Sequence, residues 1–349
     1  MLSIQSDQEL HQIIGLYGPA FQPDQWPLVC GPHGFSGAAI YRFTANSCDY
    51  ALRVWPTSES SAAKLEAMTR LLEDLHRNGI SYVAAAVRKQ DGTVATVSRS
   101  GSLIHIEPWL PGKPEDSLYF SALKQENAMQ SLARWHQAAA HHLPDSQHLD
   151  WIRPAHSGRS PGLAHRKIKL EQYLKKGILT ENQKLQISPK SADFHHRLQI
   201  CFQAHAASLW SQLQQATQQA LPLQPVLRDV WRDHVLFTGD EVTGIIDPAA
   251  FGTDSVVTDI TRLLGSIAGN NWELWDKALT SYHTSRPLSQ IERNVVGIFD
   301  LSNLLLSAIG CFERYLTVIS NPADFPVDSS DRLSGRLAEY LSRLEYYRR

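Results

Sequence analysis

Two aspartates beside a predicted hairpin are the residues best suited to chemistry. Asp229 lies shortly before an apolar run at 235–237, and Asp247 directly follows a second run at 242–246, with Gly239-Asp240 between the runs. Two short apolar runs separated by a glycine-containing turn predict an antiparallel β-hairpin. Pairing of its strands brings both carboxylates to the same edge. Phosphoryl transfer needs such a pair, because one carboxylate orients and deprotonates the attacking hydroxyl and the other holds metal on the nucleotide phosphates.

The segment around these aspartates resembles the catalytic loop of known kinases. Residues 227–234 read LRDVWRDH, similar to the H-R-D-x-x-x-x-N loop of protein kinases, and Asp247 stands where their D-F-G aspartate would. The closer resemblance is to the aminoglycoside phosphotransferase, or phosphotransferase-enzyme, family, whose loop typically reads H-G-D-x-x-x-x-N-x-L-F. Its D-x-x-x-L-L element is matched by residues 259–264, DITRLL. Trp231 and the Asp-Pro-Ala at 247–249 also resemble the fructosamine-kinase branch.

This resemblance implies an α+β, bilobal protein-kinase-like fold. We expect a nucleotide-binding N-terminal lobe at 1–107, built from a small antiparallel sheet and a helix. A larger, mainly helical C-terminal lobe follows at 108–349, with the catalytic hairpin at 226–264 and an acceptor-site insertion at about 145–222. The implied reaction moves the γ-phosphate of ATP to a hydroxyl of a small molecule, with Mg²⁺ as the metal and Mn²⁺ as the alternative. Asp229 is the expected base.

The loop departs from the family pattern at two positions. The leading histidine is replaced by Leu227, and the metal-binding asparagine is replaced by His234. Imidazole is a poor ligand for Mg²⁺, which prefers oxygen donors, and it suits Zn²⁺ or Mn²⁺ better. We take His234 and Asp247 as the metal candidates. Three readings follow: Asp247 holds the metal with water and phosphate oxygens, Asp233 joins it, or the protein is not catalytic.

A glycine-rich turn and a basic strand precede this region. The turn at 31–37 reads GPHGFSG, and the strand that follows carries Arg53 in ALRV, where kinases have V-A-I-K. Residues without a Cβ let backbone N–H groups approach an anion, and a guanidinium suits a polyphosphate. A plain hairpin loop explains the turn equally well. The expected phosphate-binding residues are Gly31, Gly34, Phe35, Ser36, Gly37 and Arg53.

The predicted helix at 61–77 corresponds to the kinase αC, with Glu66 or Glu73 as the partner of Arg53 and Glu66 slightly favoured. Residues 105–112, HIEPWLPG, are expected to form the hinge between lobes, where Glu107 and Trp109 would lie near the adenine. Pro and Gly in this segment fit a simple linker as well.

Further elements follow from hydrophobic periodicity. Strands are predicted at 28–30, 38–44, 50–55, 82–87, 93–97 and 103–106, and helices from Ser6 to Tyr17 and at 272–283, 288–316 and 330–347. A buried stripe at 129–139 includes His136, which we interpret as a core or loop-bracing histidine. Asp259 is expected to accept backbone hydrogen bonds near the catalytic loop.

Composition limits the remaining possibilities. The 349 residues carry 33 Lys and Arg against 35 Asp and Glu, so the balance gives no electrostatic sign of a nucleic-acid or membrane partner. The four scattered cysteines and the polar start MLSIQSDQEL predict a cytoplasmic protein without a signal peptide. The acceptor and the oligomeric state do not follow from the sequence. The alternatives are a nucleotide-binding pseudokinase, nucleotidyl transfer, and phosphorylation of a protein.

Overall fold

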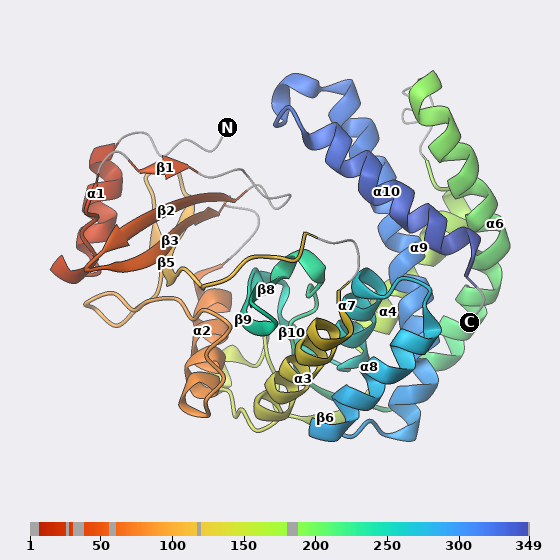
Figure 1. Cartoon of the computed structure of the whole chain (residues 1–349), viewed down its shortest axis with the longest axis horizontal. Helices are drawn as coiled ribbons and strands as arrows, with labels where there is room; N and C mark the ends of the chain where they lie inside the picture. Colours follow the sequence, from red (N-terminus) through yellow and green to blue (C-terminus); the bar gives the residue numbers. More distant parts are fainter. Residues whose placement is uncertain are drawn as a thin grey trace.

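The computed structural model describes residues 7–25, 28–30, 38–55, 61–116, 120–179 and 188–347. A five-stranded antiparallel sheet forms one end of the molecule, and helices form most of the rest (Figure 1). The α+β, bilobal kinase-like architecture predicted from the sequence is therefore confirmed. The predicted lobe boundary at 107/108 stays a prediction.

The sheet has the strand order β1-β2-β3-β5-β4. Its strands are β1 (Val29–Cys30), β2 (Ala39–Ala45), β3 (Cys48–Trp55), β4 (Thr96–Val97) and β5 (Leu103–Pro108). The predicted strand at 82–87 is wrong: only Val83 forms a bridge, and its partner is Ile245. Three alanines at 84–86 have little side chain to pack on a pleated surface, and alanine is depleted in strands.

Two helices cover the sheet. Helix α1 (Asp7–Gly15) packs Leu10, Ile13 and Ile14 against one face, whereas α2 (Ala62–Arg77) joins a hydrophobic cluster that continues into the helical part. Ser61 caps α2 by accepting a hydrogen bond from the Lys64 N–H, as its position before the apolar stripe predicts. The predicted helices here are confirmed; Ser6 lies outside the described residues.

The predicted catalytic hairpin is also present. Strands β8 (Val235–Thr238) and β9 (Glu241–Ile245) pair antiparallel around the turn at Gly239-Asp240. Beside it lies a three-stranded sheet in the order β10-β7-β6, formed by β6 (His156–Gly158), β7 (Leu221–Val226) and β10 (Gly252–Asp254). Strand β7 leads into the loop that carries Asp229, and β10 follows the loop that carries Asp247.

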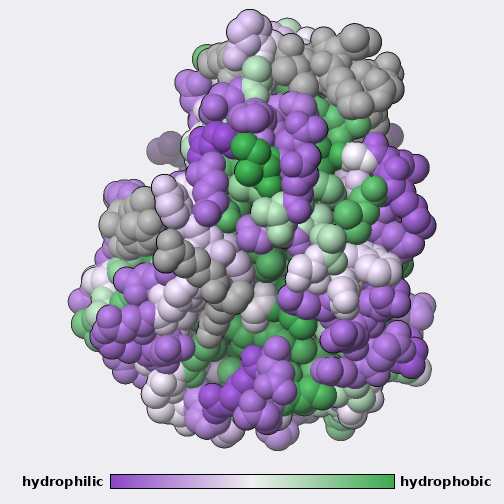
Figure 2. Space-filling view, turned by 90° about the vertical axis from the view of Figure 1, so that its right-hand side faces the viewer, coloured by the Kyte–Doolittle hydropathy of each residue, from purple (hydrophilic) through white to green (hydrophobic). Residues whose placement is uncertain are grey.

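Helices make up the remainder. The three predicted near the end of the chain are confirmed as α8 (Trp272–Ser285), α9 (Gln290–Ser320) and α10 (Ser329–Glu345), and the insertion contributes α4 (Pro161–Lys176) and α6 (Pro189–Ala216). Helices α3 (Ala122–Ala139) and α7 (Val257–Ile267) lie next to the hairpin. Seen from the right of Figure 1, this part is mainly hydrophilic, with hydrophobic residues showing between the polar ones (Figure 2).

Helix α9 is the one described helix long and apolar enough to cross a membrane, and 67% of its most apolar stretch is buried inside the protein. Buried residues repeat along it, including Phe299, Leu305 and Phe312. Helices α4, α6, α7 and α10 pack around it. Its apolar character therefore serves the core of the helical part, as the sequence predicts.

Candidate active site

The two predicted catalytic loops are held side by side by strand pairing at both ends. At one end Val226 of β7 pairs with Gly252 of β10, and at the other Val235 of β8 pairs with Ile245 of β9. Asp229 and Asp247 lie on the two enclosed loops. The sequence predicts this arrangement from the β8–β9 hairpin alone. The β7–β10 pairing holds the other ends of the two loops together and was not predicted.

Both loops contain residues in the left-handed backbone region. Arg228 has φ 67° and Asp247 has φ 59°. Non-glycine residues adopt this conformation at a cost of roughly 1–2 kcal/mol, so the surrounding contacts must hold them there. Such strain is concentrated at functional sites, and here it falls on the residues that flank or form the predicted catalytic pair.

Asp229 is fixed by an arginine that the sequence reading did not single out. Arg262 of α7 donates its Nε–H to Asp229 Oδ1 at 2.6 Å, and its second contact goes to the same oxygen. No described residue is seen to bond Oδ2, and the Asp229 side chain is 36% exposed. The ion pair thus orients the carboxylate and leaves one oxygen for a hydroxyl proton.

Asp259 holds the backbone of the loop that carries Asp229, as predicted. Its carboxylate accepts hydrogen bonds from the N–H groups of Leu227 at 2.7 Å and Arg228 at 2.6 Å. His136 of α3 lies 3.0 Å from Asp259 Oδ2 through Nε2 and 2.8 Å from the Tyr282 hydroxyl through Nδ1. These contacts confirm His136 as a loop-bracing core histidine.

The proton positions in this brace follow from burial. Burial lowers the pKa of His136, although Asp259 raises it, so the ring is neutral near pH 7 and carries one N–H. Burial raises the pKa of Tyr282, which therefore keeps its proton and donates to Nδ1. The Nε2–H is then available for Asp259. Each group in this series of hydrogen bonds, from the Tyr282 hydroxyl to the loop backbone, therefore has a partner.

Arg53 connects the sheet to the metal loop. Its Nε–H donates to Glu107 Oε1 at 2.6 Å, and its NH1 group lies 3.4 Å from Asp247 Oδ1. Burial alone would lower the pKa of Arg53, but the charges of Glu107 and Asp247 outweigh it, so the pKa is raised. Burial likewise opposes ionisation of Glu107, yet Arg53 and His105 lower its pKa to about 2. Both partners are therefore charged at neutral pH.

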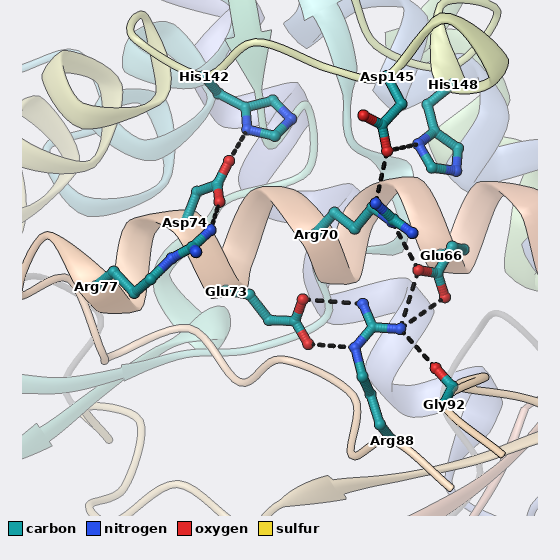
Figure 3. A network of polar contacts seen from close by, with 10 residues as sticks. All are labelled: Glu66, Arg70, Glu73, Asp74, Arg77, Arg88, Gly92, His142, Asp145 and His148. Atoms are coloured by element: carbon teal, nitrogen blue, oxygen red, sulfur yellow. Dashed lines mark hydrogen bonds and ion pairs between the residues drawn. The ribbon is translucent and has the colours of Figure 1, made fainter.

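The predicted pairing of Arg53 with Glu66 or Glu73 is wrong. Glu66 binds Arg70 and Arg88, and Glu73 binds Arg88 in a bidentate contact (Figure 3). Both acids lie on the face of α2 that meets the segment around Arg88. The partner of Arg53 is Glu107, which stands diagonally across the β3–β5 ladder, where Arg53 pairs with His105.

The carboxylate of Glu107 is engaged by Arg53, and the expected position of Glu107 near the adenine stays a prediction. The Trp109 side chain is 41% exposed, with the Arg42 guanidinium 4.6 Å from its ring, and the Trp109 backbone N–H donates to the Asp49 carbonyl at 2.9 Å. The expected position of Trp109 near the adenine also stays a prediction. The glycine turn, with Gly31, Gly34, Phe35, Ser36 and Gly37, lies outside the described residues.

His234 faces its own loop through one ring nitrogen. Its Nδ1–H donates to the Asp229 carbonyl at 2.7 Å, and its ring meets Trp231 edge-on. In the neutral ring the free electron pair is then on Nε2. Metal-binding histidines commonly donate their other N–H to a backbone carbonyl in this way. Among the described residues, no group of three or more His, Cys, Asp or Glu side chains could hold a metal by itself.

Sequence reasoning missed Arg262 and the role of Glu107. Both contacts join segments that are far apart in the chain, so no local pattern identifies the two partners. A weak signal existed for Arg262: it lies three residues after Asp259, so both side chains belong to one face of a short helix.

The model of the phosphotransferase enzyme family matches residues 31–286, well over half of the chain. The chain belongs to the phosphotransferase enzyme family. The match extends from the glycine turn to the end of α8, so it includes both candidate loops. A comparison with curated protein sequences finds no match.

Several solved structures have the same fold. Amicoumacin kinase hAmiN, in complex with AMP-PNP, Ca²⁺ and Ami, has a TM-score of 0.65 at 16% identity and covers 97% of this chain and 93% of its own. Spectinomycin phosphotransferase APH(9)-Ia, in complex with ADP and its antibiotic, has a TM-score of 0.64 at 12% identity and covers 99% and 96%. A microcompartment-associated aminopropanol kinase has a TM-score of 0.59 at 12% identity and covers 98% and 97%.

Proposed function

We propose that this member of the phosphotransferase enzyme family moves the γ-phosphate of ATP to a hydroxyl group of a small molecule. The observation that carries the proposal is the pair of enclosed loops, which present Asp229 and Asp247 beside each other with Arg53 next to Asp247. Family membership supports the reaction class, and the structures with AMP-PNP and ADP belong to proteins of the same fold.

In the proposed reaction Asp229 Oδ2 takes the proton of the acceptor hydroxyl. The hydroxyl oxygen bonds to the γ-phosphorus while the bond from that phosphorus to the β,γ-bridging oxygen breaks, and ADP leaves. Arg262 keeps Asp229 in place, because it binds the other carboxylate oxygen. Asp259 and His136 hold the loop backbone, so the base does not have to be ordered when the substrate arrives.

Asp247 is the residue that would hold Mg²⁺. Its carboxylate offers hard oxygen donors and is 30% exposed, which suits an ion that usually keeps waters and substrate phosphate oxygens among its ligands. Bound there, Mg²⁺ would neutralise phosphate charge. Arg53, already charged and buried, supplies a fixed positive charge beside the same carboxylate.

The test compares three aspartate variants. Asp229→Asn should abolish phosphoryl transfer and leave ATP binding nearly intact, since the base acts on the acceptor. Asp247→Asn should weaken metal-dependent ATP binding. Asp240→Asn, in the hairpin turn, is the matched control and should change neither. ATP affinity is measured by calorimetry with Mg²⁺ and Mn²⁺, and transfer is measured as ADP formed with a panel of hydroxyl compounds.

Three results would contradict the proposal. Absence of ATP affinity with either metal would reject nucleotide chemistry altogether. Equal loss of ATP binding in Asp229→Asn and Asp247→Asn would reject the division of roles. ATP binding without transfer to any acceptor would favour the pseudokinase, for which the replacement of the usual asparagine by His234 is the specific observation.

A further inference from the structure

A cavity of about 620 Å³ opens next to the candidate base. It is bounded by α4, α7, α9 and α10, which pack together at the right of Figure 1, away from the five-stranded sheet. Arg262 lines this cavity and also binds Asp229, and Arg228 lines it from the catalytic loop. The volume is in the range of cavities that hold small molecules. Asp229 does not line the cavity itself, but its chain neighbour Arg228 and its ion-pair partner Arg262 do.

The charge of the lining is strongly positive. Among the described residues that line it, the one carboxylate is Asp254, and it is opposed by six cationic side chains. These are Arg166 and Lys169 of α4, Arg228 of the catalytic loop, Arg262 of α7, Arg314 of α9 and Arg336 of α10. Five separate segments thus direct cations into one space. The whole chain is nearly neutral, so this is a local feature.

The carboxylates nearby have other tasks. Asp254 accepts hydrogen bonds from the Ser160 hydroxyl at 2.5 Å and the Ser255 N–H at 2.8 Å, and Asp229 is engaged by Arg262. Arg166 and Arg228 hydrogen bond to neutral oxygens; burial costs such cations their hydration, and like charges close together repel one another. An incoming anion would relieve both costs.

The cost of burial and of repulsion between cations is clearest at Arg166. Arg166 donates to the neutral Thr258 hydroxyl at 3.0 Å and stacks on Phe299 at 4.9 Å. Burial, then Arg262 and Arg228, lower the pKa of its guanidinium to about 10, although Asp254 raises it. Arg228 is similar in one respect: it donates one N–H to Thr253 O, but its buried Nε has no partner among the described residues.

Arg228 packs closely against a neighbouring strand, and Arg166 shares a helix face with a second cation. A Cβ at Gly252 would lie 2.5 Å from Arg228 Cζ, so the Arg228 guanidinium packs directly against the β10 backbone at this glycine. On α4, Arg166 and Lys169 are three residues apart and therefore share one helix face. The three cations therefore lie on two elements that border the same cavity.

We propose that the acceptor is an anionic hydroxy compound, whose phosphate or carboxylate group binds the cationic cavity at Arg166 and Lys169 while its hydroxyl reaches Asp229. This inference rests on the proposed function and names the substrate class of the same site. A guanidinium binds phosphate or carboxylate through parallel hydrogen bonds. A polycationic acceptor such as an aminoglycoside would be repelled by the six cations.

The experiment uses acceptors that differ mainly in charge. ADP formation from ATP is measured with glycerol 3-phosphate, glycerate and glycerol, with glucose 6-phosphate, gluconate and glucose, and with spectinomycin as a cation. We expect one or more anions to be phosphorylated, with kcat/KM at least about tenfold above that of the neutral counterpart, as a charged hydrogen bond would give. The phosphate and carboxylate members of each set separate the two anion sources.

The matched variants are Lys169→Gln, Arg166→Gln and the control Lys167→Gln. Lys167 lies on the same helix but does not line the cavity; its ammonium contacts Trp210. The two cavity variants should raise the KM for the anionic acceptor about tenfold or more and leave the KM for ATP unchanged. Lys167→Gln should leave both unchanged. Lys169→Gln is the milder change, because Lys169 is only half-buried.

A second readout does not need activity. Calorimetry with inorganic phosphate should show binding to wild type and to Lys167→Gln, and weaker binding to the two cavity variants. Preference for the neutral or cationic acceptors would overturn the inference and leave the proposed function standing. Phosphate binding without any preference for anionic acceptors would also overturn it. Loss of ATP binding or transfer altogether would reject the proposed function, whereas phosphate binding in that case would still support the anionic cavity.

Discussion

At the residue scale, neighbouring residues rather than burial set the orientation of the Asp229 and Asp247 carboxylates. One is oriented by Arg262 through a single oxygen, and the other lies beside Arg53 in a left-handed conformation. A free aspartate would rotate, and its carboxylate would be hydrated on both oxygens. Here the fold supplies the orientation in advance, which is how positioning lowers a reaction barrier.

His234 is the residue that departs most from the family pattern, and it leads to a prediction about metal use. If its Nε2 contributes to the metal site, the enzyme should prefer Mn²⁺, because imidazole binds Mn²⁺ more readily than Mg²⁺. Restoring the family's residue by His234→Asn should raise the rate with Mg²⁺ relative to Mn²⁺. Initial rates of both proteins in both metals provide the measurement.

The same comparison has a clear negative result. An unchanged Mg²⁺-to-Mn²⁺ ratio would assign His234 to loop packing through its hydrogen bond to the Asp229 carbonyl. Asp247 would then account for the metal without it. Trp231→Phe is a useful control, because it alters the ring that packs on His234 but adds and removes no ligand.

At the element scale, pairing of β3 with β5 creates the buried network around Arg53. Glu107 is ionised there, with its pKa lowered from 4.5 to about 2. A carboxyl group whose pKa is lower in the folded state stabilises folding above its unfolded pKa, and this contribution is lost as the pH falls from about 4.5 toward 2. Stability should therefore decrease over that window.

We predict that Glu107→Gln lowers the free energy of unfolding by about 3–5 kcal/mol at pH 7, because it leaves Arg53 without its closest buried partner. The difference from wild type should shrink between pH 4.5 and pH 3, because Glu107 of the unfolded chain binds a proton in that range while Glu107 of the folded chain stays ionised. Urea unfolding at pH 7, 4 and 3 measures it. Glu241→Gln, exposed on β9, is the control. A difference that stays constant with pH would contradict the assignment.

The elements also mark the limit of sequence reasoning. The helices around Leu72 and Phe299 were predictable, because their apolar residues repeat with helical spacing. The hairpin before Asp247 was predictable from its turn. The partner of Arg53 was not, because Glu107 meets it only through the β3–β5 register, which no local pattern encodes. The cationic cavity likewise depends on five segments that are distant in the chain.

At the scale of the whole molecule, the sheet and the helical part share a core. One hydrophobic cluster contains Trp55 and Leu103 of the sheet, Leu72 of α2, and Trp135 and Trp275 of the helical part. Helix α2 also contacts the segment that follows α3: Asp74 hydrogen bonds to His142, and Arg70 forms an ion pair with Asp145 (Figure 3). This core includes residues on both sides of the predicted lobe boundary at 107/108, which itself stays a prediction.

The last prediction tests this shared core with Leu72→Ala. Leu72 is 1% exposed, and removing most of its side chain should lower the free energy of unfolding by about 2–5 kcal/mol. Leu123→Ala on α3 is the matched control; that side chain is 51% exposed and should cost no more than about 0.5 kcal/mol. Urea unfolding is followed by tryptophan fluorescence and by circular dichroism.

Because the cluster extends from Trp55 of the sheet to Trp275 of α8, both signals should report one coincident transition, and Leu72→Ala should shift it as a whole. Two separated transitions, with Leu72→Ala moving only one of them, would show that the lobes unfold independently. In that case the predicted division at 107/108 would describe two folding units, and the contacts of α2 with the helical part would be too weak to couple them. A single shifted transition would instead mean that substrate binding at either lobe stabilises the entire chain.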